Sequence, residues 1–344
     1  MRRIILHLKR LWQAALGRIY ATVTGRPPYQ RRYAALGDYR GHADNEPEYD
    51  IVYVLPPDHM GVWILQAICR EIDRYFQGSS FMVRFPDRLP TARAYFYSHY
   101  GYFRDVLLAQ PEVQRGRNIL FYTHPRELWF SEAELYHSFT YADVALSMSS
   151  LFARHLEEKG VPNVQLALTG ADRDFFHSHE RGGGAVGFCS GYYPRKNGDL
   201  MLEIIRLMPD TRFRLCGRHW RQWERWEELS ALDNFDYIEI EYDHYPEFYT
   251  SLDVIVSVSV LEGGPIPLIE AMMSNVVPVA SRTGHAPDLI AHGDNGFLFD
   301  VGSAASEICG LIAKAMRLKG DIRKTVEHLT WERFSAQVVA AAGL

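Results

Sequence analysis

Short apolar runs alternate with longer amphipathic segments along most of the chain. The first run, residues 50–55 (DIVYVL), predicts a buried strand, and the turn after it leads into a predicted helix that continues to about Phe76. The same pattern predicts helices from about residue 199 and over residues 267–273, and strands at residues 118–122, 144–147, 165–168, 185–189, 212–216, 238–241, 254–258 and 277–280. Strands that alternate with helices predict an α/β fold whose parallel sheets carry helices on both faces.

The length of 344 residues predicts two domains, because one hydrophobic core usually organises about 100–200 residues. The polar stretch that ends in Gly182–Gly184 is the predicted hinge. The expected organisation is an extension at residues 1–49, a Rossmann-like doubly wound domain at 50–170, the hinge at 171–184, a second such domain at 185–325, and a C-terminal segment at 326–344. Two such domains face each other across a cleft, and ligands are expected there, beyond the carboxyl ends of the strands.

The composition indicates a folded protein of a reducing compartment, which predicts a cytoplasmic location. The chain is 47% hydrophobic and 23% charged, in the ordinary range for globular proteins. Its four cysteines are widely spaced and form no CxxC pair, which favours buried thiols. The net charge of -5 does not suggest nucleic acid as a partner, and the histidines show no metal-ligand spacing.

The first 37 residues differ sharply from this average. They contain eight basic residues and no acidic ones: Arg2, Arg3, Lys9, Arg10, Arg18, Arg26, Arg31 and Arg32. Apolar residues recur there at spacings of three and four, which predicts a helix with one apolar and one cationic face. Such a helix can lie on an anionic membrane, so residues 1–32 are the predicted contact with the inner face of the membrane. Packing on the protein's own surface and a cleaved targeting peptide remain the alternatives.

The densest chemical signal lies between residues 259 and 273, in SVLEGGPIPLIEAMM. Gly263 and Gly264 allow the backbone to approach a ligand closely, and a proline opens the helix that follows. The amide groups at such a helix start favour an anion. The carboxylates of Glu262 and Glu270 suit hydroxyl groups of a sugar or a ribose.

The run from Ser259 to Asp300 resembles the donor-site region of family-4 retaining glycosyltransferases, including their E-x7-E motif. The resemblance implies the GT-B fold, with two Rossmann-like domains and a C-terminal helix that crosses back to the first. By the same resemblance, Glu262 contacts the transferred sugar and Glu270 the nucleotide ribose. The amides of Gly263 and Gly264, followed by Pro265, contact the diphosphate of the donor.

Residues 186–199 (VGFCSGYYPRKNGD) resemble the segment that opens the second domain in this family. It supplies a lysine to the donor phosphates, and Lys196 stands at that position. A lysine there neutralises the charge that develops on the leaving diphosphate. The family's usual partner arginine is replaced by Gly191, and the neighbouring Arg195 is the candidate substitute.

Three segments resemble this family outside the donor region. Residues 59–61 (HMG) resemble its first strand-to-helix loop, where Gly61 is the one glycine kept of the customary two. His124, at the end of a predicted strand, matches a histidine near the reacting carbon. Residues 330–334 (TWERF) resemble the C-terminal helix that crosses back to the first domain.

The resulting hypothesis is a retaining, hexosyltransferase-type enzyme that moves a sugar from a nucleotide-diphosphate-sugar to a hydroxyl. The acceptor is expected to be a glycan or a lipid-linked molecule in bacterial polysaccharide or glycolipid assembly, with no cofactor and no metal. The aromatic segments at residues 95–102 and 219–226 are interpreted as core or rim, with an acceptor surface as the alternative. Gly191 and the single glycine at residue 61 depart from the family's pattern. A non-catalytic scaffold protein that binds a nucleotide sugar therefore remains an alternative. A nucleotide-sugar 2-epimerase or a phosphorylase of the same fold is the other alternative.

Overall fold

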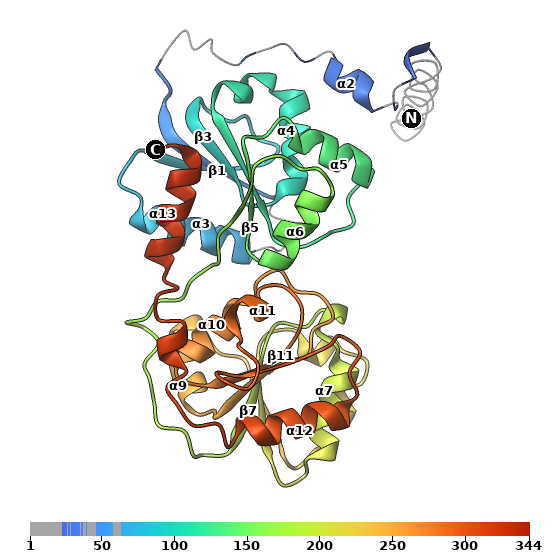
Figure 1. The fold of residues 1–344 in the computed structure, drawn as a ribbon, viewed down its shortest axis with the longest axis vertical. Coiled ribbons are helices and arrows are strands. Elements are labelled where there is room, and N and C mark those ends of the chain that lie inside the picture. The colour runs from blue at the N-terminus through green and yellow to red at the C-terminus, as the bar shows by residue number, and fades with distance from the viewer. Residues whose placement is uncertain are drawn as a thin grey trace.

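The computed structural model describes residues 23–344, apart from residues 26, 28, 35, 37, 38, 40–45 and 58–62. It contains two six-stranded sheets, each in its own half of the molecule (Figure 1). All strand pairs that the structure describes are parallel. The predicted class, α/β with two doubly wound sheets, is confirmed.

The first half has the strand order β2-β1-β3-β4-β5-β6. Its strands are β1 (Tyr49–Leu55), β2 (Ser80–Arg84), β3 (Ala92–Tyr97), β4 (Arg117–Tyr122), β5 (Val144–Ser147) and β6 (Val164–Leu166). Its helices are α2 (Gln30–Ala34), α3 (Trp63–Tyr75), α4 (Phe103–Ala109), α5 (Glu132–Phe139) and α6 (Ser150–Glu158), with the 3-10 helices η2 (Tyr100–Tyr102) and η3 (Pro111–Arg115). Successive side chains of a strand point to opposite faces, so Val52 and Val54 join one core cluster and Ile51 and Tyr53 the other.

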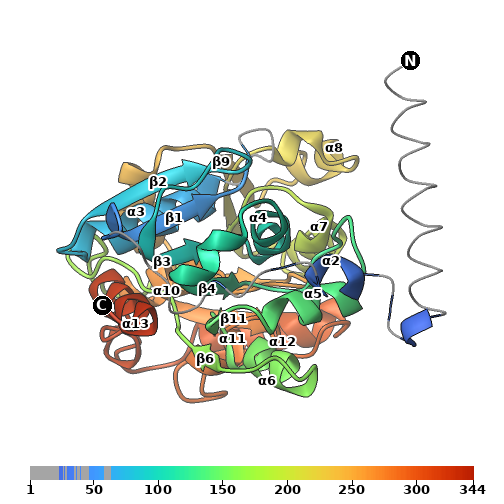
Figure 2. The same cartoon turned by 90° about the horizontal axis from the view of Figure 1, so that it is seen from above.

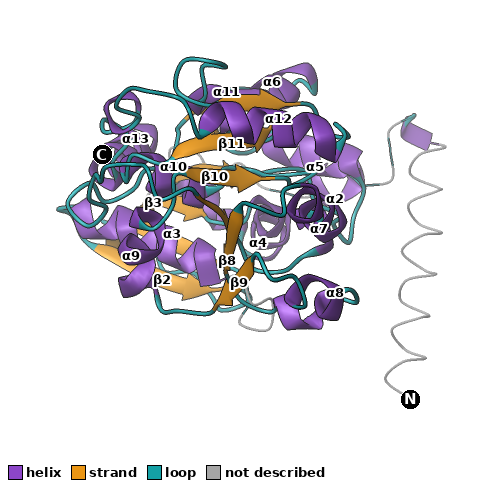
Figure 3. Ribbon diagram, turned by 90° about the horizontal axis from the view of Figure 1, so that it is seen from below, coloured by secondary structure: helices purple, strands orange, loops and turns teal. Residues whose placement is uncertain are grey.

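The second half has the order β12-β11-β10-β7-β8-β9. Its strands are β7 (Ala185–Cys189), β8 (Arg212–Cys216), β9 (Phe235–Ile238), β10 (Val254–Ser257), β11 (Val277–Ser281) and β12 (Phe297–Phe299). Its helices are α7 (Gly198–Leu207), α8 (Trp226–Ser230), α9 (Tyr245–Thr250), α10 (Ile266–Met273), α11 (Ala286–Leu289) and α12 (Ala305–Ala315), with η4 (Pro194–Lys196), η5 (Trp220–Gln222), η6 (Tyr242–His244) and η7 (Arg323–Thr325). Helices α7 and α12 lie on one side of the strands and α9 and α10 on the other (Figure 3).

The C-terminal helix α13 (Trp331–Ala342) belongs to the first half, as the resemblance implied. It lies beside α3 in Figure 1. The Ser335 hydroxyl donates to the Ile72 carbonyl, and the ring of Phe334 packs against that of Phe121. The Thr330 side chain caps the helix by accepting from the Arg333 amide. The chain therefore crosses between the halves twice, once after β6 and once before α13.

Three strands, β2, β3 and β12, were not predicted, and the strand expected at residues 238–241 lies earlier, as β9. Strands β2, β9 and β12 are edge strands of their sheets, where one side has no strand neighbour. Their short or half-exposed sequences give a weak periodic signal. Strand β3 is central; its aromatic segment, interpreted as core or rim, belongs to the core, since Tyr95 and Tyr97 are buried.

The extension at residues 1–49 is described only in part, so the predicted membrane helix lies mostly outside the described residues. Helix α2 lies alongside α5 (Figure 2). Its Tyr33 is buried against His137 and Tyr141, and Arg32 reaches Glu134. This part of the extension packs on the protein's own first half.

The four cysteines are all free thiols, with Cys69 and Cys216 buried and the other two partly buried. Within the described ranges, no helix combines the length and the apolar character needed to cross a membrane.

Candidate functional site

The two halves meet where the carboxyl ends of their strands face each other. Strand β4 ends just before Thr123, and the loop after β10 brings Gly263 against it. A Cβ on Gly263 would lie 2.6 Å from the Thr123 carbonyl oxygen. A Cβ on Gly264 would lie 2.5 Å from the Met148 side chain, which follows β5. At Gly263 the obstacle is backbone, so only glycine permits the approach there, and the predicted Gly263–Gly264 pair lies at the junction of the two sheets.

Two hydrogen bonds hold the loop between β10 and α10 before its glycine pair. The Val260 amide donates to the Arg195 carbonyl, and the Glu262 amide donates to the Thr283 hydroxyl. Helix α10 begins after Pro265 without a side-chain cap. Within the described chain, the amides of Gly263 and Gly264 have no acceptor, so they can donate to an anion.

Glu262 is a buried carboxylate that faces two cations. Its Oε2 accepts from Arg195 Nη1 at 2.9 Å, and its Oε1 accepts from Lys196 Nζ. Burial alone would raise the pKa of Glu262, but Lys196 and Arg195 outweigh it and hold the value at about 2. The carboxylate is therefore ionised at neutral pH, and the cluster carries one excess positive charge.

Arg195 and Lys196 belong to η4, which follows β7. Arg195 Nη1 also donates to the Leu261 carbonyl at 2.9 Å, which fixes the guanidinium beside the loop. Gly191 lies three residues before η4, and a Cβ there would be 3.6 Å from the Arg218 carbonyl oxygen. Arg195 is thus the arginine that this chain brings to Glu262.

His124 follows β4 and is buried, with 7% of its surface exposed. The Tyr100 hydroxyl donates to its carbonyl oxygen at 2.8 Å and holds the backbone in place. Burial, followed by the positive charges of Arg126 and Arg195, lowers the pKa of His124 to about 3. Its Nδ1 has no partner among the described residues. A neutral imidazole of this kind can form hydrogen bonds but does not act as a general acid near pH 7.

Glu270 has a different set of neighbours. It is buried in α10, and its two oxygens accept from the hydroxyls of Tyr242 and Tyr249, each at 2.7 Å. Burial raises the pKa of Glu270 to about 7, although both hydrogen bonds oppose the change. No contact with Glu262 is seen. The two carboxylates of the motif therefore differ in charge state near neutral pH.

The remaining predicted position, Gly61, lies outside the described residues. Sequence reasoning missed Arg126, Thr283 and His285, which each follow the carboxyl end of a strand within a few residues. That position is itself a signal, since ligands of such sheets bind there. In the part of the chain that the structure describes, no group of three or more His, Cys, Asp or Glu side chains is arranged to hold a metal.

Two Rossmann-like sheets whose strand ends meet at glycines, cations and carboxylates define the two-domain GT-B class. Residues 153–328, just over half of the chain, match the family described as glycosyl transferases group 1. The chain belongs to this family. No curated protein sequence matches the chain.

Solved structures share this fold at low sequence identity. HepE of Anabaena, solved in complex with UDP-glucose, superposes with a TM-score of 0.70 at 13% identity, over 86% of this chain and 100% of its own. A glycosyltransferase from Rickettsia africae has a TM-score of 0.66 at 13% identity, over 86% and 98%. TarM of S. aureus, as a G117R mutant in complex with fondaparinux, alpha-GlcNAc-glycerol and UDP, has a TM-score of 0.60 at 16% identity, over 73% and 55%.

Proposed function

We propose that this protein is a retaining glycosyltransferase that moves a hexose from a nucleotide-diphosphate-sugar to a hydroxyl acceptor. The family membership supports glycosyl transfer. The observation that carries the proposal is the cluster of Glu262, Lys196 and Arg195 beside Gly263, at the junction of the two sheets. Cations and exposed amides in one place suit a diphosphate, and a carboxylate among them suits a sugar hydroxyl.

Each residue has a proposed role. Lys196, Arg195 and the amides of Gly263 and Gly264 bind the diphosphate, and Pro265 ends that loop. A bound diphosphate would replace Glu262 as the counter-ion of the two cations and leave the carboxylate to a sugar hydroxyl.

Three further positions complete the proposed donor site. Glu270 binds the ribose, because each of its oxygens has a second lone pair beyond the tyrosine bond. His124, being neutral, accepts or donates one hydrogen bond at the sugar. Gly61 is proposed as a close-approach glycine from its sequence context alone.

The test is donor consumption in a panel of nucleotide sugars with sugar acceptors. Glu262→Gln keeps the shape but removes the negative charge that is proposed to accept from a sugar hydroxyl, so turnover should fall by roughly 100-fold or more. Exposed Glu307, in α12, gives the matched control Glu307→Gln, which should leave turnover unchanged. The anomeric configuration of the product, read by NMR, tests retention; an inverted product would contradict it.

Two alternatives correspond to distinct results of the same assay. A nucleotide sugar that binds but is never consumed would indicate the non-catalytic scaffold. Conversion of the donor into an isomer without acceptor would indicate the 2-epimerase.

We also propose that the basic segment at residues 1–32, of which residues 1–28 precede α2, holds the enzyme on the inner, cytoplasmic face of a bacterial membrane, where a lipid-linked or glycan acceptor is assembled. The basic, amphipathic composition of this segment supports the proposal. Because α2 packs on α5, a membrane-bound segment before it would keep the first half near the lipid. Binding to vesicles with anionic lipid, with and without residues 1–28, tests it.

A further inference from the structure

Arg126 is a partly buried cation for which the described chain supplies no counter-ion. It follows His124 by two residues, at the carboxyl end of β4. Its Nε is buried without a hydrogen-bond partner, and no described carboxylate forms an ion pair with it. Burial lowers the pKa of Arg126, and the nearby Arg195 acts in the same direction. A guanidinium nevertheless stays charged in proteins, so this is a positive charge in need of a partner.

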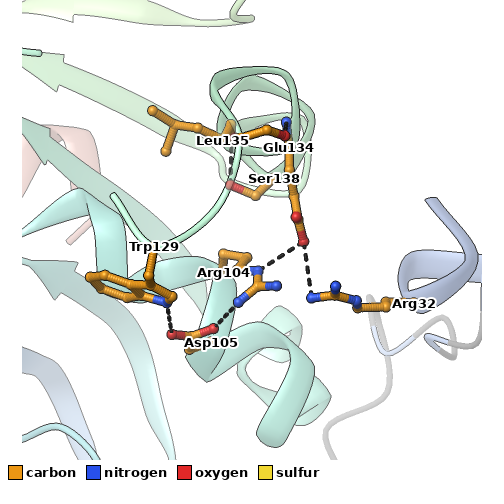
Figure 4. Close-up of polar contacts among 8 residues, drawn as sticks. Arg32, Arg104, Asp105, Trp129, Glu134, Leu135 and Ser138 are labelled. Atoms are coloured by element: carbon orange, nitrogen blue, oxygen red, sulfur yellow. Dashed lines mark hydrogen bonds and ion pairs between the residues drawn. The ribbon is translucent and has the colours of Figure 1, made fainter. Parts of the chain in front are cut away.

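Arg104, in the same half of the molecule, shows how the chain pairs an arginine that has only a structural role. Its Nε donates to Glu134 Oε1 at 2.9 Å, and its Nη1 donates to Asp105 (Figure 4). Burial would lower the pKa of Arg104, but these two carboxylates outweigh it and raise the value. Arg32 also reaches Glu134, and the Trp129 indole donates to Asp105 (Figure 4). Both carboxylates are therefore already engaged by other donors.

The groups that face Arg126 are neutral or positive. Tyr100 and Tyr102 are near enough to affect the pKa of Arg126, as is Tyr193 from the second half. Burial and the charge of Arg126 lower the pKa of His99 to about 3, so this ring is neutral as well. Tyr102 packs against Trp129, whose ring is about half exposed. An aromatic wall beside an unpaired guanidinium is suited to a ligand that has both an apolar or sugar face and a negative group.

We infer that Arg126 binds an anionic group, a phosphate or a carboxylate, on the acceptor. This inference rests on the proposed glycosyl transfer. Arg126 belongs to the first half, whereas Lys196, Arg195 and the Gly263–Gly264 amides of the second half already account for the donor diphosphate. The planar guanidinium matches phosphate and carboxylate in a bidentate geometry, so Arg126 would discriminate between charged and neutral acceptors.

The test uses inorganic phosphate as the probe, with UDP present to occupy the donor half. The melting temperature of the full chain is followed with sodium phosphate and with sodium chloride at equal ionic strength. The variants are Arg126→Met, Arg126→Lys as a more conservative change, and Arg88→Met as a control, because Arg88 is exposed on the first half and pairs only with Glu112. The UDP affinity of each variant is measured in parallel.

We expect phosphate, but not chloride, to raise the melting temperature of the wild type and of Arg88→Met. Arg126→Met should abolish this rise and Arg126→Lys should reduce it. The UDP affinity of each variant should change by less than about twofold. An equal phosphate effect in wild type and Arg126→Met would overturn the inference. So would a loss of about tenfold or more in UDP affinity in Arg126→Met, because the anion would then be the donor's own. If the wild type binds no nucleotide, the proposed function fails, and the phosphate titration without UDP still decides the role of Arg126.

Discussion

Among single residues, the buried carboxylates of Glu262 and Glu270 have different neighbours and different charge states near neutral pH. Glu262 is neutralised by cations and stays ionised, with a pKa of about 2. Glu270 has only two tyrosine hydroxyls to compensate its burial, and its pKa rises to about 7. A buried carboxylate without a cation favours its protonated form. Ribose hydroxyls can donate to Glu270 most strongly when it is ionised, so nucleotide binding should strengthen as pH rises through about 7.

The raised pKa of Glu270 predicts a pH-dependent loss of stability. The carboxyl titrates near 4.5 when unfolded and near 7 when folded, so its contribution is complete below about pH 4.5 and is lost as pH rises through about 7. Glu270→Gln is neutral throughout, and its stability relative to wild type should rise by on the order of 2 kcal/mol between about pH 5 and pH 8. Urea unfolding at the two pH values measures this.

The control for this comparison is Glu307→Gln, on the exposed face of α12. Its difference from wild type should be the same at both pH values. An equally constant difference in Glu270→Gln would show that the carboxyl is not titrating between them.

The sequence could propose Glu262, Lys196 and Glu270 as candidates, because each stands in a recognisable run of neighbouring residues. It could not show that Arg195 and Lys196 share Glu262, since these residues are 66 and 67 positions away from it along the chain. The tyrosines that hold Glu270 come from η6 and α9, and only the packing of those elements on α10 brings them together. Arg126 was missed because one arginine after a strand carries no motif.

At the scale of elements, the loop before α10 is the part that joins the two sheets. Gly263 lies directly against Thr123, and a Cβ would meet the backbone there. Gly263→Ala should therefore destabilise the protein by about 1–3 kcal/mol and weaken nucleotide binding. Gly310→Ala in α12 is the matched control, since a Cβ there meets nothing within 4 Å. This substitution should stabilise the protein by about 0.4–1 kcal/mol. Nucleotide titration and denaturant unfolding of both variants check this, and unchanged behaviour of Gly263→Ala would contradict the close approach.

Helix α13 should contribute to the stability of the first half although it ends the chain. Phe334 is fully buried, between Phe121 and Trp331. Phe334→Ala should cost about 3–5 kcal/mol, because it removes a large side chain from a packed core. Exposed Arg333→Ala, one residue earlier, should cost less than about 0.5 kcal/mol. If denaturant unfolding gave similar costs for both variants, α13 would not be part of the core.

The order of strands and helices was largely predictable, because buried parallel strands are apolar runs and the helices between them are amphipathic. Strand β5 and strands β7 and β8 lie where the pattern placed them. Edge strands β2 and β12 were not predicted: β2 is only half buried, and β12, although buried, has three residues and is too short to show a period.

At the scale of the whole molecule, the charge of the chain is divided unevenly, with a basic first segment on an otherwise acidic protein. Deleting residues 1–28 should abolish binding to vesicles with anionic lipid and leave donor consumption intact. The deletion stops before α2, because Tyr33 and Arg32 contact the first half. Removing them would add a loss of packing to any loss of membrane contact. A vesicle co-sedimentation assay measures binding, and neutral vesicles serve as the control. Equal binding of the two forms to anionic vesicles would contradict membrane contact through this segment.

Glu262, Gly263, Gly264 and Glu270 form the core of the proposed nucleotide-sugar site. The most direct measurement is the melting temperature of the full chain against a panel of nucleoside diphosphates and their sugars, because a ligand of the folded state alone raises it. We expect a rise with one nucleotide class, which Glu270→Ala abolishes and Glu307→Ala leaves unchanged. No rise with any member, or the same rise in Glu270→Ala, would contradict it.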